Sequence, residues 1–283
     1  MIADLLRLAS GALALTRPLN CGITAVSVLV GALTSGFLQW SDGLALATLS
    51  AALLTGAGNA YNDLLDLDID RVNRPHRPLP SGRVSPHAAR REAVTLGAIG
   101  LALAWWLGPI CGVMASTVAL GLVAYSHWLK RAGLAGNVVV SSLAAAAFPY
   151  GALAMGALGR SWVPAGFAFL YHLGREVAKD VEDMEGDRHQ GTRSLALTLG
   201  ARRARRVSAT ILSLLGVSAV VPWAAGMYGS PYLSIIVVLW AIVGAALTLL
   251  LIRPRPAGDQ TLSRLLTAGM AVGLAAIAAG ELL

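Results

Sequence analysis

The chain has 283 residues, of which 56% are hydrophobic and only 13% are charged, whereas soluble domains carry about 25% charged residues. This composition argues against a soluble protein. The net charge of +7 comes from 22 basic residues, 20 of them Arg, without the aromatic residues between them that a nucleic-acid surface would need. Nucleic acid is therefore not an expected partner, because cytoplasmic loops of membrane proteins carry the same basic excess. Cys21 and Cys111 each lie in an apolar run, which favours buried small residues over a disulfide or metal pair.

The N-terminal segment 1–18 is too polar for a signal peptide, since it contains Asp4, Arg7 and Arg17. Its apolar residues fall on one helical face; they are Ile2, Leu5, Leu6, Ala9 and Leu13. The segment is predicted to be either a short interfacial helix or a frayed terminus.

Nine apolar segments have about the length that a membrane-spanning helix needs. They cover residues 19–38, 44–62, 91–108, 110–127, 134–156, 163–180, 206–226, 232–252 and 262–282. The sequence therefore predicts an all-α integral membrane protein with nine transmembrane helices in one bundle, organised as a single membrane domain over residues 1–283.

The basic residues predict how this bundle is oriented. Nearly all of them lie in the loops 63–90, 128–133, 181–205 and 253–261, which share one side of the membrane with the N-terminus. The positive-inside rule places that side in the cytoplasm, and only Arg160 breaks the pattern clearly. The loops 63–90 and 181–205 are long enough to be functional, and we expect them to be catalytic. The expected location is the cell membrane.

Two acidic motifs end the second and sixth predicted spans. Asp63, Asp66 and Asp70 have the spacing D-x-x-D-x-x-x-D, and the same spacing recurs 117 residues later in Asp180, Asp183 and Asp187. On a helix these steps fall on one face, where like charges repel unless a cation lies among them. Oxygen ligands without clustered His or Cys favour Mg²⁺ or Ca²⁺. The repeated spacing also favours two related halves of four helices, plus one additional helix.

Basic residues beside both motifs complete a predicted diphosphate site, because Mg²⁺ is commonly shared between carboxylates and substrate phosphates. The predicted phosphate-binding residues are Arg71, Arg74, Arg77, Lys130, Arg175 and Lys179. Contact with lipid headgroups is the alternative for the loop arginines, including Arg131. Arg175, Glu176 and Lys179 lie at or near membrane depth, where ionisable groups are usually functional. His172 contacts either substrate or core, and Trp128 is a candidate for the lining of the site.

These motifs resemble those of the UbiA family of intramembrane prenyltransferases. The first signature is N-D-L-L-D-L-D-I-D at 62–70, followed by N-R-P-H-R-P-L-P-S-G at 73–82. Y-S-H-W-L-K at 125–130 and the second acidic motif are also similar to the family. The resemblance covers the whole chain and implies a bundle of nine helices with both motifs on one face. The segment 175–188 resembles most the archaeal branch that transfers a geranylgeranyl group to geranylgeranylglyceryl phosphate.

The resemblance implies an enzyme in which Mg²⁺ binds a prenyl diphosphate, the allylic C–O bond ionises and the acceptor attacks. The implied metal ligands are Asn62, Asp63, Asp66, Asp70, Asp180, Asp183 and Asp187. The implied catalytic residues are Asp66, Asp70, Asp183, Asp187, Lys130 and Tyr125. Candidates for the acceptor phosphate are Arg193, Arg188 and Arg83. The expected partners are the prenyl diphosphate donor, a lipid-like phosphate acceptor and the bilayer, without an obligate protein partner.

Two other functions remain open. A prenyltransferase with an aromatic acceptor, such as 4-hydroxybenzoate or another quinone or haem precursor, would share the fold and the metal. A cation transporter would place its charges near the middle of the bilayer, whereas the acidic motifs lie at the cytoplasmic ends of the predicted spans.

Overall fold

The computed structural model describes residues 10–36, 41–189 and 193–283, and every regular element in these ranges is helical. The all-α fold is therefore confirmed. Of the N-terminal segment, Ser10–Thr16 is helical and is bent by 48° relative to the next helix. The part of the predicted interfacial helix before residue 10 lies outside the described residues.

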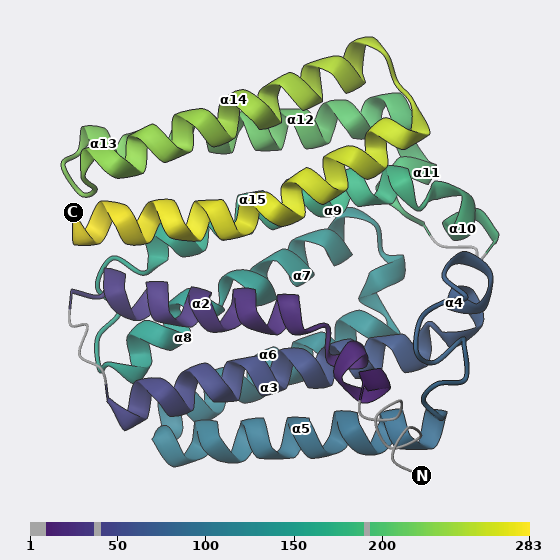
Figure 1. Cartoon of the computed structure of the whole chain (residues 1–283), viewed down its shortest axis with the longest axis horizontal. Coiled ribbons are helices and arrows are strands. Elements are labelled where there is room, and N and C mark those ends of the chain that lie inside the picture. Colours follow the sequence, from purple (N-terminus) through teal and green to yellow (C-terminus); the bar gives the residue numbers. More distant parts are fainter. Residues whose placement is uncertain (1–9, 37–40, 190–192) are drawn as a thin grey trace.

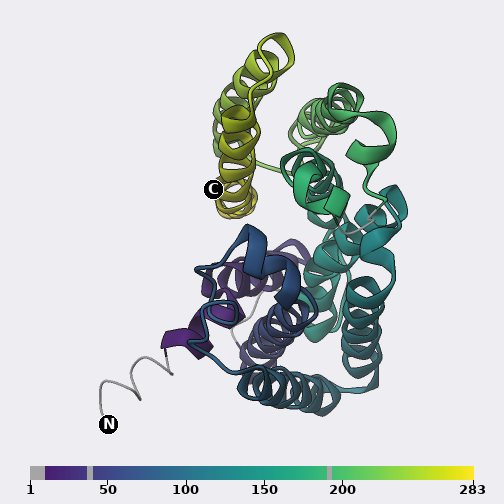
Figure 2. The same cartoon turned by 90° about the vertical axis from the view of Figure 1, so that its right-hand side faces the viewer.

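The long helices lie along one common direction and form a bundle (Figures 1 and 2). The first half contains α2 (Pro18–Thr34), α3 (Asp42–Leu65), α4 (Leu67–Asn73), α5 (Pro86–Leu107), α6 (Pro109–His127), the 3₁₀ turn η1 (Leu129–Arg131), α7 (Leu134–Ala145) and α8 (Ala147–Ala154). The second half contains α9 (Trp162–Glu182), α10 (Met184–His189), α11 (Leu195–Leu199), α12 (Ala201–Ser218), α13 (Val221–Ala224), α14 (Ser230–Ile252) and α15 (Pro256–Leu282).

Local sequence explains where several helices begin and bend. The hydroxyls of Ser41 and Ser85 accept hydrogen bonds from backbone N–H groups at the starts of α3 and α5, as N-cap residues do. Proline follows directly at the start of α5 and α6, where its missing N–H costs nothing. The predicted span 134–156 is divided at Ala146 into α7 and α8, and Pro149 lies in the first turn after the break.

Six helical stretches of the described chain are long and apolar enough to cross a membrane, and the bent pair of Ser10–Thr16 with α2 would be a seventh. The other two predicted spans correspond to α5 and α9, which are long helices with charged residues. Arg90, Arg91 and Glu92 lie near the start of α5, and α9 carries Arg175 and Lys179. The protein is thus a multi-pass membrane protein, while the number of nine spans stays a prediction.

Both acidic motifs break their helix at the middle aspartate. Asp66 ends α3 with φ −89° and ψ 5°, and Asp183 ends α9 with φ −90° and ψ 1°. The i→i+4 hydrogen bond to the last aspartate persists, since Asp70 N donates to Asp66 O at 2.8 Å and Asp187 N donates to Asp183 O at 2.9 Å. Each motif therefore runs across two consecutive helices and not along one continuous helix. The shared break supports the interpretation of two related halves.

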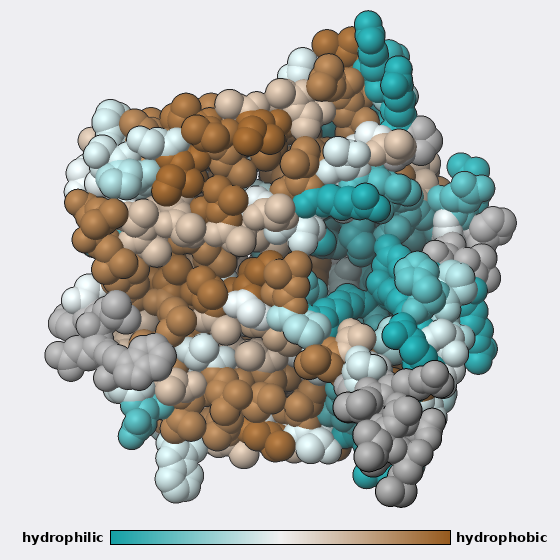
Figure 3. Space-filling model, viewed as in Figure 1, coloured by the Kyte–Doolittle hydropathy of each residue, from teal (hydrophilic) through white to brown (hydrophobic). Residues whose placement is uncertain are grey.

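Two hydrophobic clusters hold the bundle together. One joins α9, α12, α14 and α15 around Leu212 and Tyr232, and the other joins α2, α3, α6 and α8 around Val28 and Leu44. Helices α2 and α8 approach so closely that a Cβ at Gly31 would lie 2.0 Å from the carbonyl oxygen of Phe148, which is the close packing that small residues permit in membranes. Hydrophilic residues gather at the end of the bundle where α4, α10 and α11 lie (Figure 3).

Candidate active site

A cavity of about 710 Å³ lies at this hydrophilic end of the bundle. Both acidic motifs contribute to its lining, through Asn62, Asp66, Asp70, Asp180, Asp183 and Asp187. The cations that line it are Arg17, Arg74, Arg77, Lys130, Arg131, Arg175 and Lys179. Segments more than 100 residues apart in sequence therefore form one charged chamber, as the sequence predicted for most of these residues.

Asp66 is positioned by its own helix and by the end of α6. The side-chain amide of Asn62, one turn earlier on α3, donates to Asp66 Oδ2 at 2.7 Å. Lys130 lies in η1 directly after α6 and forms an ion pair with the same oxygen. The hydroxyl of Ser126 donates to Asn62 Oδ1 at 3.4 Å. The segment 125–130 thus lies against the first acidic motif. Two segments that both resemble motifs of the same family therefore contribute to one site.

Asp63 and Asp70 share Arg77, which lies in the loop after α4. Arg77 Nη1 is 2.5 Å from Asp70 Oδ2 and 3.3 Å from Asp63 Oδ1. Asp63 also forms an ion pair with Arg17. Asp63 is buried and does not line the chamber, whereas Asp70 does. Asp63 therefore positions Arg17 and Arg77. This arrangement does not support its predicted role as a metal ligand.

One ion pair joins the two motifs across the chamber. Arg74 Nη2, from the first loop, is 3.3 Å from Asp183 Oδ1. Lys179 Nζ, one turn before Asp183 on α9, is 3.7 Å from the other carboxylate oxygen. Asp183 is therefore held by a cation from each half of the chain.

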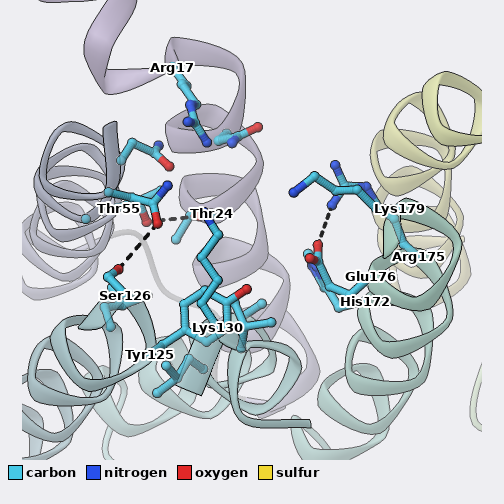
Figure 4. Close-up of a pocket in the computed structure, with 18 of the residues that line it drawn as sticks. Arg17, Thr24, Thr55, Tyr125, Ser126, Lys130, His172, Arg175, Glu176 and Lys179 are labelled. Atoms are coloured by element: carbon cyan, nitrogen blue, oxygen red, sulfur yellow. Dashed lines mark hydrogen bonds and ion pairs between the residues drawn. The ribbon is translucent and has the colours of Figure 1, made fainter. Parts of the chain in front are cut away.

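Helix α9 forms one wall of the chamber. His172, Arg175, Glu176 and Lys179 face the interior, opposite Arg17 and Thr55, with Tyr125 and Lys130 contributed by the α6 end (Figure 4). Arg175 Nη1 donates to Glu176 Oε1 at 2.8 Å, while Arg175 Nε is buried without a hydrogen-bond partner among the described residues. These charged side chains therefore face the interior of the bundle.

The remaining acids of the second motif are contacted by α7 and by the segment that follows α10. Asp180 Oδ2 accepts hydrogen bonds from Asn137 Nδ2 at 3.0 Å and from the backbone N–H of Leu195 at 3.2 Å. Burial raises the pKa of Asp187, although a hydrogen bond from Ser194 opposes the shift. Burial removes water from the carboxylate of Asp187, and a bound metal cation would offset the cost of keeping it charged.

The oxygen donors fit a magnesium ion that is shared with a ligand. Within the described part of the chain, no three His, Cys, Asp or Glu side chains lie close enough together to form a metal site from protein ligands alone. Mg²⁺ does not need such a cage, because it usually keeps several waters and takes only one or two carboxylates plus substrate phosphates. Carboxylates on two walls of one chamber provide half-sites of this kind.

Several predicted residues lie elsewhere. Arg71 pairs with the exposed Asp68 at 2.7 Å and does not line the chamber. Arg83 donates to the backbone oxygen of His76 at 2.7 Å. Arg188, Arg193 and Trp128 are exposed and are also absent from the lining.

The chamber is also lined by polar and charged residues that the sequence did not single out. Arg17, Asn59 and Asn137 line the chamber. Arg17 immediately precedes an apolar span, so that its sequence context is that of a topology anchor. The two asparagines lie inside apolar runs, and their polarity at membrane depth was a signal that could have identified them.

Residues 23–279 match the UbiA prenyltransferase family. The chain is 38% identical over 274 residues to the digeranylgeranylglyceryl phosphate synthase of Methanopyrus kandleri, covering 95% of this chain and 98% of that protein. The synthase of Thermococcus kodakarensis is 37% identical over 237 residues, with 83% and 85% of the two chains covered.

Solved structures share the fold. A structure from work on digeranylgeranylglyceryl phosphate synthase in membranes has a TM-score of 0.76 and 27% identity, covering 97% of this chain and 98% of that one. A UbiA homologue from Archaeoglobus fulgidus bound to GPP and Mg²⁺ has a TM-score of 0.62 at 18% identity, covering 95% of this chain and 99% of that one. The matched motifs, the shared fold and the charged chamber together identify the chain as a member of the UbiA prenyltransferase family.

Proposed function

We propose that this membrane enzyme transfers a geranylgeranyl group from geranylgeranyl diphosphate to the free hydroxyl of geranylgeranylglyceryl phosphate. The products are digeranylgeranylglyceryl phosphate and diphosphate. The observation that carries the proposal is the joining of both acidic motifs and seven cations in one chamber. The acceptor follows from the relatives that are 37–38% identical and carry this synthase name.

Asp66, Asp70, Asp183 and Asp187, together with Asn62, are the residues that would hold Mg²⁺. When bound, the metal supplies positive charge against the negative charge that develops on the leaving diphosphate. The protein itself contributes Lys130, Arg77 and Arg74, which pair with these carboxylates in the structure. Each cation is close enough to the chamber to move its hydrogen bonds to phosphate oxygens, and Arg suits bidentate contact with them.

The reaction then follows from the separation of charge in a chamber lined by cations. The allylic C–O bond of the donor breaks, and the electron pair stays with the diphosphate, where the cations stabilise it. The hydroxyl oxygen of the acceptor bonds to the allylic carbon, and its proton passes to a diphosphate oxygen. Tyr125 borders the same space from α6 and orients the reacting groups.

We infer that the enzyme lies in the cell membrane with its N-terminus and chamber on the cytoplasmic side. The basic residues support this orientation, and α4, α10 and α11 lie together at the chamber end of the bundle (Figure 1).

The test uses the purified protein in detergent or nanodiscs with geranylgeranyl diphosphate, Mg²⁺ and one acceptor at a time. We expect mass spectrometry to detect the doubly prenylated glyceryl phosphate, and no product with 4-hydroxybenzoate. Transfer to 4-hydroxybenzoate without transfer to geranylgeranylglyceryl phosphate would overturn the proposal. The aromatic-acceptor function would then replace it.

A further inference from the structure

Two apolar branches belong to or adjoin the charged chamber, and they follow different pairs of helices. The first, which we call the α3–α6 branch, belongs to the same cavity as the acidic motifs. Its apolar lining includes Ala51, Leu54, Met114, Val118, Leu122 and Leu143. The second, the α9–α15 branch, is lined by Phe167, Tyr171, Leu239, Trp240, Gly273 and Leu274. The two cavities share Ile23, Ser27, Ala144, His172 and Met270 in their walls, so the branches adjoin each other at these residues.

The α3–α6 branch begins at the metal-binding end of α3. Residues 62, 58, 55 and 51 line the cavity, and their steps of four, three and four place them on one helical face. On α6, residues 126, 122, 118 and 114 form the facing stripe. A chain attached to a diphosphate at Asn62 and Asp66 therefore has a continuous apolar path between these two helices.

The α9–α15 branch also lies between two helical stripes, but cations instead of carboxylates lie at its entrance. On α9, residues 179, 175, 172 and 168 form a stripe with the same steps. On α15, residues 263, 267, 270 and 274 face it. The stripe on α9 has cations at its charged end, where Lys179 and Arg175 lie between His172 and the acidic motif. A monophosphate needs a cation and no metal cluster, and Arg175 meets that need.

We propose that the two branches hold the two isoprenoid chains separately, with the donor chain in the α3–α6 branch and the acceptor chain in the α9–α15 branch. This inference rests on the proposed function, in which donor and acceptor each carry one such chain. The reacting ends then meet where the branches join, beside His172. The α9–α15 branch encloses about 90 Å³, whereas the cavity that contains the other branch encloses about 710 Å³. The α9–α15 branch holds the first carbons of the acceptor chain, and the rest extends along α14 and α15 into lipid.

Separate branches predict that the two Michaelis constants can be changed independently. Gly273→Leu fills the α9–α15 branch, since a Cβ at Gly273 meets no atom within 4 Å. We expect it to raise the KM for geranylgeranylglyceryl phosphate about tenfold and to leave the donor KM within about twofold. Gly244→Leu is the matched control, because Gly244 is equally open but lines only a groove between α12 and α14.

Val118→Phe tests the other branch. We expect it to raise the KM for geranylgeranyl diphosphate about tenfold, with the acceptor KM within about twofold. Val123→Phe is its control on the same helix, because Val123 is exposed and lines neither cavity. Leu143→Phe and Ala168→Leu repeat the test from a second helix of each branch, and size-exclusion chromatography in detergent identifies variants that have not folded.

Crossed effects in the folded variants would support the proposal. The proposal would be overturned if Gly273→Leu and Val118→Phe raised the same KM equally. It would also be overturned if Gly273→Leu raised the donor KM and Val118→Phe raised the acceptor KM. Failure of the unmodified enzyme to use geranylgeranylglyceryl phosphate would instead contradict the proposed function, so the two failures are distinguishable.

Discussion

Asp66 and Asp68 are two residues apart in one acidic stretch and have opposite environments. Asp66 is buried, lines the chamber and binds Asn62 and Lys130. The side chain of Asp68 is 91% exposed and pairs with the exposed Arg71. Two aspartates that are close in sequence therefore differ in burial and in their ion-pair partners.

Substitution at these two positions tests that difference directly. Asp66→Asn should lower kcat/KM for prenyl transfer by at least about 100-fold, because it removes the charge that opposes Lys130 and that would hold the metal in the proposed reaction. Asp68→Asn should leave kcat/KM within about twofold of the unmodified enzyme. Steady-state kinetics at saturating Mg²⁺ provide the measurement. Equal losses in the two variants would contradict the assignment of the site.

Asp63 belongs to the same spacing pattern but acts through Arg17 and Arg77. Asp63→Asn leaves both cations without their shared carboxylate, and we expect unfolding to become easier by about 1–3 kcal/mol. Thermal unfolding in detergent should show a lower Tm, with a smaller loss of kcat than in Asp66→Asn. A normal Tm together with a loss of activity as large as that of Asp66→Asn would instead favour direct metal binding by Asp63.

At the scale of helices, the N-terminus of α15 is tied to α12 by one bidentate pair. Arg205 Nε and Nη2 lie 2.8 and 2.6 Å from the two carboxylate oxygens of Asp259. The carboxylate is buried and lies in the first turn of α15, where a negative charge is favourable. This pair fixes the helix that borders the second apolar branch.

We expect Asp259→Asn to destabilise the protein by about 3 kcal/mol, since it leaves Arg205 partly buried without its counterion. Arg203→Ala is the matched control on the same helix, because Arg203 is exposed; it should leave the Tm unchanged. Differential scanning fluorimetry of both variants in one detergent would compare them. A Tm for Asp259→Asn equal to that of the control would show that the pair adds no stability.

Most helices could be predicted from hydrophobic length alone, because a membrane span needs a long apolar run. Their ends were less predictable. The predicted loops 63–90 and 181–205 contain α4, α10 and α11, which are short helices without a long apolar run. The ion pairs that Asp66 and Asp183 form with Lys130 and Arg74 are tertiary contacts, which spacing does not encode. Because side-chain contacts are not encoded in spacing, Arg71 was expected in the site and Arg17 was not. Of these two residues, Arg17 lines the chamber and Arg71 does not.

At the scale of the whole molecule, the chamber lies between two halves, which would contact a bound ligand from opposite sides. The first half supplies α3, α4 and η1, and the second supplies α9 and α10. In this structure Arg74 and Asp183 form a direct ion pair between them. A metal–diphosphate complex would replace this ion pair by several contacts from both halves, so its binding should stabilise the whole bundle.

We therefore expect Mg²⁺ and a non-hydrolysable prenyl diphosphate together to raise the Tm. At a ligand concentration of 100 times Kd the stabilisation is about 2.7 kcal/mol. Either component alone should give a smaller shift, and EDTA should abolish both the shift and prenyl transfer, with recovery on adding Mg²⁺. Asp183→Asn should reduce the shift, whereas Asp68→Asn should not. Full transfer activity in EDTA would contradict a metal-dependent reaction.

The pairing of Asp66, Asp70 and Asp183 with Lys130, Arg77 and Arg74 has a further consequence for ionic strength. The resting chamber is close to electroneutral, since the protein provides its own counterions. When a metal diphosphate binds, the cations exchange their carboxylate partners for phosphate oxygens and the carboxylates exchange theirs for the metal. The total charge in the chamber then changes little. Affinity should accordingly fall less steeply with added salt than it would at a cluster of free arginines. The same neutrality limits the electrostatic cost of placing six charged groups at the edge of a lipid bilayer.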